Sequence, residues 1–267
     1  MTAAAEGAPE SPAQRPVASY LAPAGDGAIG VDLPVPRRAL AIGAHPDDID
    51  FGCGGTLAKW AAAGCAVTEL VLTDGSKGSW DPTADRATLV ALRQEEQRAA
   101  AAALGAGDVV FLGYVDGELG SGLAERAEVC RVIRETRPDV VLGHDPWKRY
   151  RLHPDHRHAG YLAVEGIVAA RDPHFFPDQG LSAHRPACLL LWEADVVDHV
   201  ESIDGFLAAK LTALLSHRSQ WESTMGIETD QAAEEQAFET RIRERAAEAG
   251  ALAGRPLAEP FKRLDRL

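Results

Sequence analysis

Two hydrophobic patterns alternate along most of the chain. Short continuous apolar runs favour buried strands, and longer stretches with an apolar residue at every third or fourth position favour helices. The predicted strands lie at residues 39–44, 66–75, 108–113, 138–145, 187–194 and 196–202. The predicted helices lie at residues 53–64, 85–104, 123–136, 156–171, 203–217 and 230–253. This alternation predicts an α/β fold, namely a Rossmann-like, mainly parallel sheet with helices on both faces.

The first 36 residues do not share this periodicity. They are rich in Ala, Pro and Gly, a composition that buries little apolar surface. We therefore expect a flexible or loosely docked leader at residues 1–36. The remainder, residues 37–267, has a length typical of one large α/β domain, and we predict a single domain there.

Composition and charge narrow the range of partners. The chain has 267 residues, 46% of them hydrophobic, and a formal net charge of −13. Because Lys and Arg do not cluster, we expect neither nucleic acid nor a membrane as a partner. No apolar run approaches the roughly 20 residues of a membrane span, and the N-terminus does not resemble a secretory signal. The four cysteines are widely spaced, so we expect free buried thiols and a cytoplasmic protein.

The strongest chemical signal follows the first predicted strand, where the sequence reads Ala44-His45-Pro46-Asp47-Asp48. In a parallel sheet, ligands bind at the carboxyl ends of the strands. Pro46 keeps His45 extended, and His45 and Asp48 can then converge on one Zn²⁺ ion. A cation would also relieve the repulsion between the adjacent aspartates, and Asp47 would be left to face the attacking water.

A second cluster follows the fourth predicted strand. It contains the sequences HDPW from His144 and HPDHRH from His153. A catalytic zinc site needs three protein ligands and one open position. One histidine of this cluster would complete the set, and the others would remain available as acids or oxyanion donors.

Two simpler interpretations of the first motif stay open at this stage. Asp47 and Asp48 could cap a helix without taking part in any chemistry. Gly52, Gly54 and Gly55 could form a phosphate-binding loop, although their spacing is not GxGxxG and acidic side chains lie beside them.

The motifs AHPDD and HPDH, in this order and at strand ends, resemble the PIG-L/LmbE-like family of zinc-dependent N-deacetylases. The resemblance covers roughly residues 40–220. It includes TDGSKG, the RxxE that begins at Arg93, YVDG around Asp116, and HRSQ at 217–220. One departure is that many members read AHPDDE, whereas Ile49 and Asp50 follow here, which leaves the role of Asp50 open.

The resemblance implies a role for each matching residue. His45, Asp48 and His156 correspond to the metal ligands. Asp47 corresponds to the general base that acts on the attacking water.

Four further residues correspond to groups around the reacting amide. His153 corresponds to the residue that stabilises the oxyanion or protonates the leaving amine, and Asp155 to the carboxylate that holds its ring. Arg93 and Asp116 correspond to substrate-binding residues.

The resemblance also implies an activity: hydrolysis of a carbon–nitrogen bond other than a peptide bond, removing an N-acetyl group from a small amino-sugar-containing molecule. The expected metal is Zn²⁺, although two imidazoles and a carboxylate also suit Fe²⁺, Ni²⁺ or Co²⁺. The alternatives are an amidase of a larger thiol–sugar conjugate, an antibiotic deacylase with the same zinc site and, ranked lowest, a catalytically silent binding protein. Similar proteins often assemble, so a homo-oligomer is among the expected partners.

Overall fold

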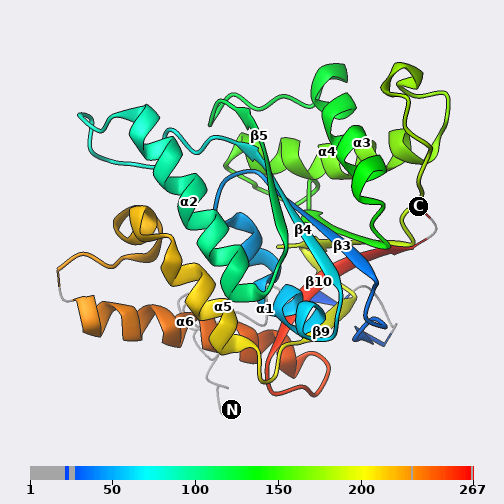
Figure 1. The fold of residues 1–267 in the computed structure, drawn as a ribbon. Coiled ribbons are helices and arrows are strands. Elements are labelled where there is room, and N and C mark those ends of the chain that lie inside the picture. The colour runs from blue at the N-terminus through cyan, green and yellow to red at the C-terminus, as the bar shows by residue number, and fades with distance from the viewer. Residues whose placement is uncertain (1–21, 24–27, 230, 266) are drawn as a thin grey trace, which may run out of the picture.

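The computed structural model describes residues 22–23, 28–229, 231–265 and 267. Its centre is an eight-stranded sheet in the order β2-β9-β10-β7-β6-β3-β4-β5 (Figure 1). The strands are β2 (Gly30–Val31), β3 (Arg38–Gly43), β4 (Ala66–Thr73), β5 (Asp108–Tyr114), β6 (Val140–His144), β7 (Cys188–Trp192), β9 (His199–Ser202) and β10 (Ala258–Asp265). A separate two-stranded pair joins β1 (Ala22–Pro23) to β8 (Val196–Val197).

Five neighbouring strands, β3 to β7, are parallel to one another. Helices connect them along the chain: α1 (Asp48–Ala62), α2 (Arg86–Leu104), α3 (Leu123–Thr136) and α4 (Pro154–Arg171), followed by α5 (Leu207–Ser216) and α6 (Gln231–Ala251). The predicted mainly parallel α/β sheet is therefore confirmed. Across the described ranges, none of these helices combines the length and the apolar character of a membrane span.

The two faces of the sheet carry separate apolar cores. Along β3, Ala39 and Ala41 pack into the core formed with α1, α2 and α5. Leu40 and Ile42 point the opposite way, into the core formed with α3 and α4. This alternation follows from the two-residue period of a strand, and it places helices on both faces as predicted (Figure 1).

The sequence pattern did not predict the C-terminal strand. β10 contains Pro260 and four charged residues, a composition that is unfavourable for a strand. It nevertheless lies between β7 and β9 and is antiparallel to both, with Phe261 fully buried. The sheet is thus mixed at one end, because tertiary packing overrides local propensity there.

Part of the predicted leader belongs to the sheet. Residues 1–21 and 24–27 lie outside the described residues. Gly30–Val31 forms β2 and pairs with β9, and the backbone amide of Leu33 donates to Glu201. At these points the described part of the segment is docked along the sheet, and the boundary of the leader at residue 36 stays a prediction.

Helix α1 starts earlier than predicted and is interrupted at Cys53, where φ is −148°. The interruption frees the backbone amides that follow it. Glu259 of β10 accepts from Gly55 N and Thr56 N at 2.9 and 2.8 Å, and Lys210 of α5 donates to the same carboxylate. Glu259 therefore caps the second half of the helix that carries the candidate site.

The three glycines after the first motif lie inside α1 and do not form a phosphate loop. A Cβ on Gly52 would come within 2.5 Å of the Trp192 ring. Glycine at this position therefore lets the helix lie directly against the indole.

The cysteines Cys53, Cys65, Cys130 and Cys188 are free and buried, as predicted. Burial raises the pKa of each thiol, to about 11 for Cys65 and about 12 for Cys188. These thiols are uncharged at neutral pH, and their environments are those of structural rather than reactive cysteines.

A buried arginine organises the segment that follows α4. The guanidinium of Arg134 donates to five backbone carbonyls at 2.9 to 3.5 Å, two of them in the last turn of α4. The negative end of that helix favours a cation.

Replacing Arg134 with methionine is expected to destabilise the protein. The change removes charged hydrogen bonds from buried carbonyls, at a cost of about 3 kcal/mol. The corresponding fall in Tm is about 6–12 °C for a chain of this size. Arg131→Met on the same helix is the control, because Arg131 forms only partly exposed pairs with Glu128 and Glu135. Equal shifts of Tm for the two variants would contradict this account of Arg134.

Candidate active site

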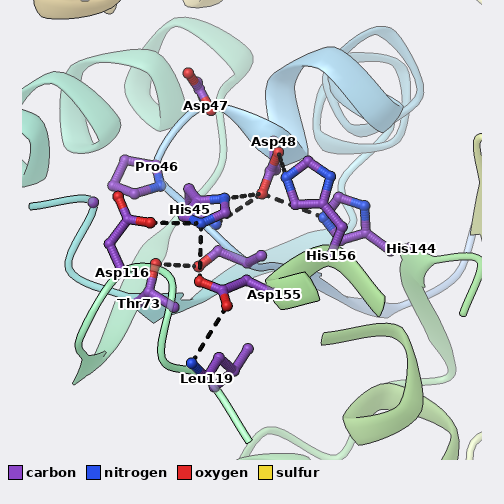
Figure 2. A network of polar contacts seen from close by, with 12 residues as sticks. His45, Pro46, Asp47, Asp48, Thr73, Asp116, Leu119, His144, Asp155 and His156 are labelled. Carbon is purple, nitrogen blue, oxygen red and sulfur yellow. Dashed lines mark hydrogen bonds and ion pairs between the residues drawn. The ribbon is translucent and has the colours of Figure 1, made fainter. Parts of the chain in front are cut away.

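The candidate site lies at the carboxyl edge of the parallel strands. His45 follows β3, Asp116 follows β5, and His144 is the last residue of β6. Asp155 and His156 lie in the first turn of α4, which starts beside the same edge (Figure 2). The fold thus brings the two sequence motifs together where open parallel sheets bind ligands.

Asp48 is the centre of the cluster. Its carboxylate oxygens lie 3.3 Å from His45 Nδ1, 3.3 Å from His144 Nε2 and 3.2 Å from His156 Nε2 (Figure 2). Burial opposes its ionisation, but His156 and His144 outweigh that effect and hold the pKa of Asp48 well below its usual value. The carboxylate is therefore charged and faces three imidazoles.

The contacts of His45 fix which nitrogen faces Asp48. His45 Nε2 lies 3.2 Å from both Asp116 and Asp155, and because carboxylates accept, Nε2 carries a proton. In the neutral imidazole, Nδ1 then presents its lone pair toward Asp48. A histidine that donates to a carboxylate through one nitrogen and offers the other to the site is typical of metal centres.

The cluster also favours positive charge at His45. Burial alone would lower the pKa of this imidazole, but hydrogen bonds to Asp116, Asp155 and Asp48 raise it well above its usual value. The three carboxylates stabilise the positive charge of a protonated imidazole. The same negative surroundings would also stabilise a metal cation.

Asp155 has a different partner from the predicted one. It was expected to hold the ring of His153, but it contacts His45 and accepts from the amides of Gly117 and Leu119 at 2.6 and 3.3 Å. The contacts found among the described residues include no hydrogen bond between Asp155 and His153. In this structure Asp155 therefore orients His45, because the loop after β5 holds its carboxylate in place.

Asp116 is likewise engaged within the protein. One of its oxygens contacts His45 and the other accepts from the amide of Lys77 at 3.0 Å. Burial acts to raise the pKa of Asp116, but the hydrogen bond and charge of His45, the amide of Lys77 and the charge of Arg93 together lower it to about 2. Its substrate-binding role stays a prediction.

His144 is held in a tautomer that does not suit metal ligation. The indole of Trp192, which only donates, contacts His144 Nδ1 at 3.0 Å. Glu193 lies 3.3 Å from the same nitrogen, but its carboxylate is also paired with Arg151 at 2.5 Å. The shorter indole bond leaves the proton of the neutral His144 ring on Nε2, which lies 3.3 Å from the Asp48 carboxylate. Trp192 is buried, so this arrangement is firmly packed.

His156 has a more adjustable environment. Arg151 donates to His156 Nδ1 at 3.0 Å, so the proton of the neutral ring lies on Nε2, which faces Asp48. Ligation through Nε2 requires that proton to leave Nε2 and the contact with Arg151 to open.

Side chains that could hold a metal form three overlapping groups among the described residues. Their members are His45, His153 and His156; Asp48, His144 and His156; and His45, Asp116 and Asp155. The predicted ligands His45, Asp48 and His156 each belong to at least one group, but none of the three groups contains all of them. Two imidazoles and a charged carboxylate match the donor chemistry of a zinc site, so the residues fit the ion. The assignment of these three residues as ligands stays a prediction.

Asp47 adopts a strained backbone conformation, with φ 97° and ψ −30°. It occupies the N-cap position of α1, but its side chain makes no capping hydrogen bond, which disfavours the simple capping interpretation. Figure 2 shows its carboxylate directed away from the histidine cluster. Burial raises the pKa of Asp47 to about 6, although Arg93 acts to lower it. The general-base role stays a prediction.

Arg93 supports the Asp47 turn. Its guanidinium donates to the carbonyls of Pro46 and Gly75 at 2.6 and 3.0 Å and lies 3.5 Å from the carboxylate of Asp47. These contacts lie within the protein, and the predicted contact of Arg93 with substrate is untested.

His153 lies at the exposed side of the cluster. Its ring stands edge-on to His45 at 4.6 Å between centroids and stacks on His156 at 4.9 Å. Burial lowers the pKa of His153, and the neighbouring imidazoles add to that effect. Its imidazole is therefore accessible for the predicted acid or oxyanion role.

Sequence reasoning missed a buried polar layer behind the Asp47 turn, formed by Asp50, Glu69, Gln97 and His217. The available signal was the helical spacing of Gln97, four residues after Arg93, which places both on one face of α2. His217 had been singled out only through its HRSQ motif.

One pocket of about 1020 Å³ opens beside the histidine cluster. Every predicted site residue except Asp155 lines it. The volume is at the upper end of the usual range for small-molecule sites. The pocket therefore has room for a ligand larger than a single sugar ring.

Comparison with known proteins gives consistent results. The family model described as PIG-L, GlcNAc-PI de-N-acetylase, matches residues 40–167. The diacetylchitobiose deacetylase of Thermococcus kodakarensis is 36% identical over 188 residues, which cover 69% of this chain and 70% of that protein.

Two further relatives extend the comparison. The 1D-myo-inositol 2-acetamido-2-deoxy-alpha-D-glucopyranoside deacetylase of Streptomyces scabiei is 37% identical over 55% of this chain, which spans about half (53%) of that relative's length. The N,N'-diacetylchitobiose deacetylase structure from Pyrococcus horikoshii, complexed with its inhibitor, superposes with a TM-score of 0.78 at 29% identity and covers 86% of this chain and 84% of that one. These matches show that the chain belongs to the PIG-L deacetylase family, as its AHPDD and HPDH motifs predicted.

Proposed function

We propose that this protein is a metal-dependent N-deacetylase that hydrolyses the acetamide of a small amino-sugar-containing molecule. The observation that carries the proposal is the charged Asp48 carboxylate within 3.3 Å of three imidazoles, at the strand edge that lines the pocket. The relatives named as deacetylases of diacetylchitobiose and of an inositol-linked acetamido sugar support this substrate class.

The proposed ligands are His45, Asp48 and His156, and the proposed metal is zinc, with Fe²⁺, Ni²⁺ and Co²⁺ as alternatives. When bound, such an ion polarises an amide carbonyl and lowers the pKa of water. Asp155 keeps the His45 ring oriented for this purpose. His144 supports the Asp48 carboxylate from its other side.

The family resemblance supports the remaining proposed roles, and the residues concerned line the pocket. Asp47 accepts a proton from the attacking water, which adds to the acetamide carbon. His153, accessible beside the cluster, stabilises the developing oxyanion or protonates the leaving amine. The carbon–nitrogen bond then breaks, and acetate and a free amine leave. Arg93 and Asp116 line the same pocket and are the proposed contacts for sugar hydroxyls.

The pocket volume favours a conjugate over a free monosaccharide, which keeps the larger alternatives in view. A thiol–sugar conjugate or a glycosylated antibiotic would use the same catalytic groups and differ only in the part of the ligand that fills the outer pocket. The proposal also includes a homo-oligomer and a cytoplasmic location.

The direct test is a substrate panel for the zinc-loaded protein, comprising N-acetylglucosamine, N,N'-diacetylchitobiose, an N-acetylglucosaminyl inositol and an N-acylated thiol–sugar conjugate. We expect acetate and free amine in a one-to-one ratio from at least one acetylated conjugate, and slower release from the monosaccharide. If no member of the panel releases acetate or amine, the proposed function is wrong.

A further inference from the structure

The helix behind the candidate site carries three buried polar side chains on one face, Arg93, Glu96 and Gln97 of α2. Residues at i, i+3 and i+4 of a helix share a face. Arg93 supports the carbonyl side of the Asp47 turn, and Glu96 accepts from the amide and hydroxyl of Ser219. Gln97 reaches the turn from the remaining side.

Both hydrogens and the oxygen of the Gln97 side-chain amide form hydrogen bonds. Its Nε2 donates to Glu69 at 2.9 Å and to Asp50 at 3.1 Å, and its Oε1 accepts from the backbone amide of Asp47 at 2.7 Å. The backbone N–H of Asp47 can only donate, so the atom that faces it is the amide oxygen, and the amide nitrogen faces Asp50 and Glu69. The orientation of the side chain is therefore fixed, and its oxygen has to face Asp47.

Asp47 needs such support because its backbone is strained. A φ of 97° is rare for a residue with a Cβ, and conformations of this kind persist only where the surroundings enforce them. The flanking peptide groups are held at three points: Arg93 binds the Pro46 carbonyl, Phe51 N donates to the Asp47 carbonyl, and Gln97 binds the Asp47 amide.

We propose that Gln97 is a positioning residue for the deacetylation reaction: it holds the Asp47 amide and thereby presents the Asp47 carboxylate to the pocket. The inference rests on the proposed function, in which Asp47 is the general base. Gln97 does not line the pocket and is fully buried, so it acts through Asp47 and not on substrate. The buried Asp50–His217 pair supports this arrangement, since His217 Nε2 lies 2.9 Å from the same Asp50 oxygen that accepts from Gln97.

Two substitutions separate positioning from mere stability. Gln97→Met keeps the volume but removes the acceptor for Asp47. Gln97→Glu keeps an oxygen that can accept from the Asp47 amide. Burial beside other acidic side chains favours protonation of its second oxygen, which can then donate to one carboxylate. Glu96→Gln is the matched control, because Glu96 is buried on the same face but bonds Ser219 and not the Asp47 turn.

Three quantities are measured on each zinc-loaded variant, well below its Tm: kcat and KM for acetate release, metal per chain, and the hydrogen-exchange rate of the Asp47 amide. For Gln97→Met we expect exchange at least about 10-fold faster and kcat lower by about 30- to 100-fold, with KM and metal content unchanged. Gln97→Glu is expected to keep the exchange protection and to recover at least about 10-fold in kcat relative to Gln97→Met. Glu96→Gln should resemble the wild type in all three measurements.

Unchanged exchange and kcat in folded Gln97→Met would overturn the inference, as would a Gln97→Glu variant that keeps protection but is as slow as Gln97→Met. If Gln97→Met does not fold, Gln97→Glu alone tests the inference. Retention of both the exchange protection at Asp47 and the kcat supports the inference. Loss of either one while metal is bound overturns it. If the wild type releases no acetate from the whole panel, the proposed function fails, but the exchange rates still test the contact at Asp47.

Discussion

Asp48→Ala is expected to abolish metal binding, lowering the metal content from about one ion per chain to a trace. Asp48 supplies the charged oxygens at the centre of the cluster, and among the described residues no other carboxylate contacts all three imidazoles around it. A metal ion contributes several kcal/mol to carbonyl polarisation, and each 1.4 kcal/mol is a tenfold change in rate. We therefore expect acetate release to fall at least about 1,000-fold. Elemental analysis of the dialysed protein and a rate assay on the same sample check both parts.

The control for this variant is Glu193→Gln. Glu193 lies beside the cluster and contacts His144 and Arg151, but it is not among the proposed ligands. It is expected to keep the metal. An Asp48→Ala protein that retains stoichiometric metal would contradict the placement of the ion.

The second large effect is expected for Asp47→Asn, which should lose rate and keep metal. General-base catalysis typically contributes about 10²- to 10⁴-fold, and the amide of asparagine cannot replace a carboxylate as a base. Asparagine tolerates positive φ better than most residues, so the strained turn should survive. The measurements are kcat, metal content and Tm. A kcat within threefold of wild type would show that Asp47 is not the base, and loss of metal would place Asp47 in the metal site instead.

Much of the fold was predictable because its central strands are short apolar runs that are largely buried. The run at residues 39–44 and the later runs appear as β3 to β7 with only small changes at their ends. β10 was not predictable in the same way, because Pro260 and its charged neighbours suggest a loop. Only its pairing with β7 and β9 explains why this segment is a strand.

The sequence predicted which motifs form the site, because each motif follows a parallel strand. The carboxyl ends of parallel strands meet at one edge, so His45 and the HPDH motif had to lie close together. Which groups pair across the site was not predictable. Asp155 turned out to face His45 instead of its sequence neighbour His153, because the loop after β5 binds its carboxylate. The bond between Gln97 and Asp47 likewise depends on how α2 packs, and the motif alone does not encode it.

The most direct test of the account is removal and return of the metal in the wild-type protein. The protein is treated with a chelator, dialysed, and assayed for acetate release from N,N'-diacetylchitobiose before and after addition of one equivalent of Zn²⁺. The account predicts an inactive metal-free protein that binds about one ion per chain and regains its rate in proportion to the metal bound. Full activity in the metal-free protein, or no binding of the added metal, would contradict the assignment of His45, Asp48 and His156 as a catalytic metal site.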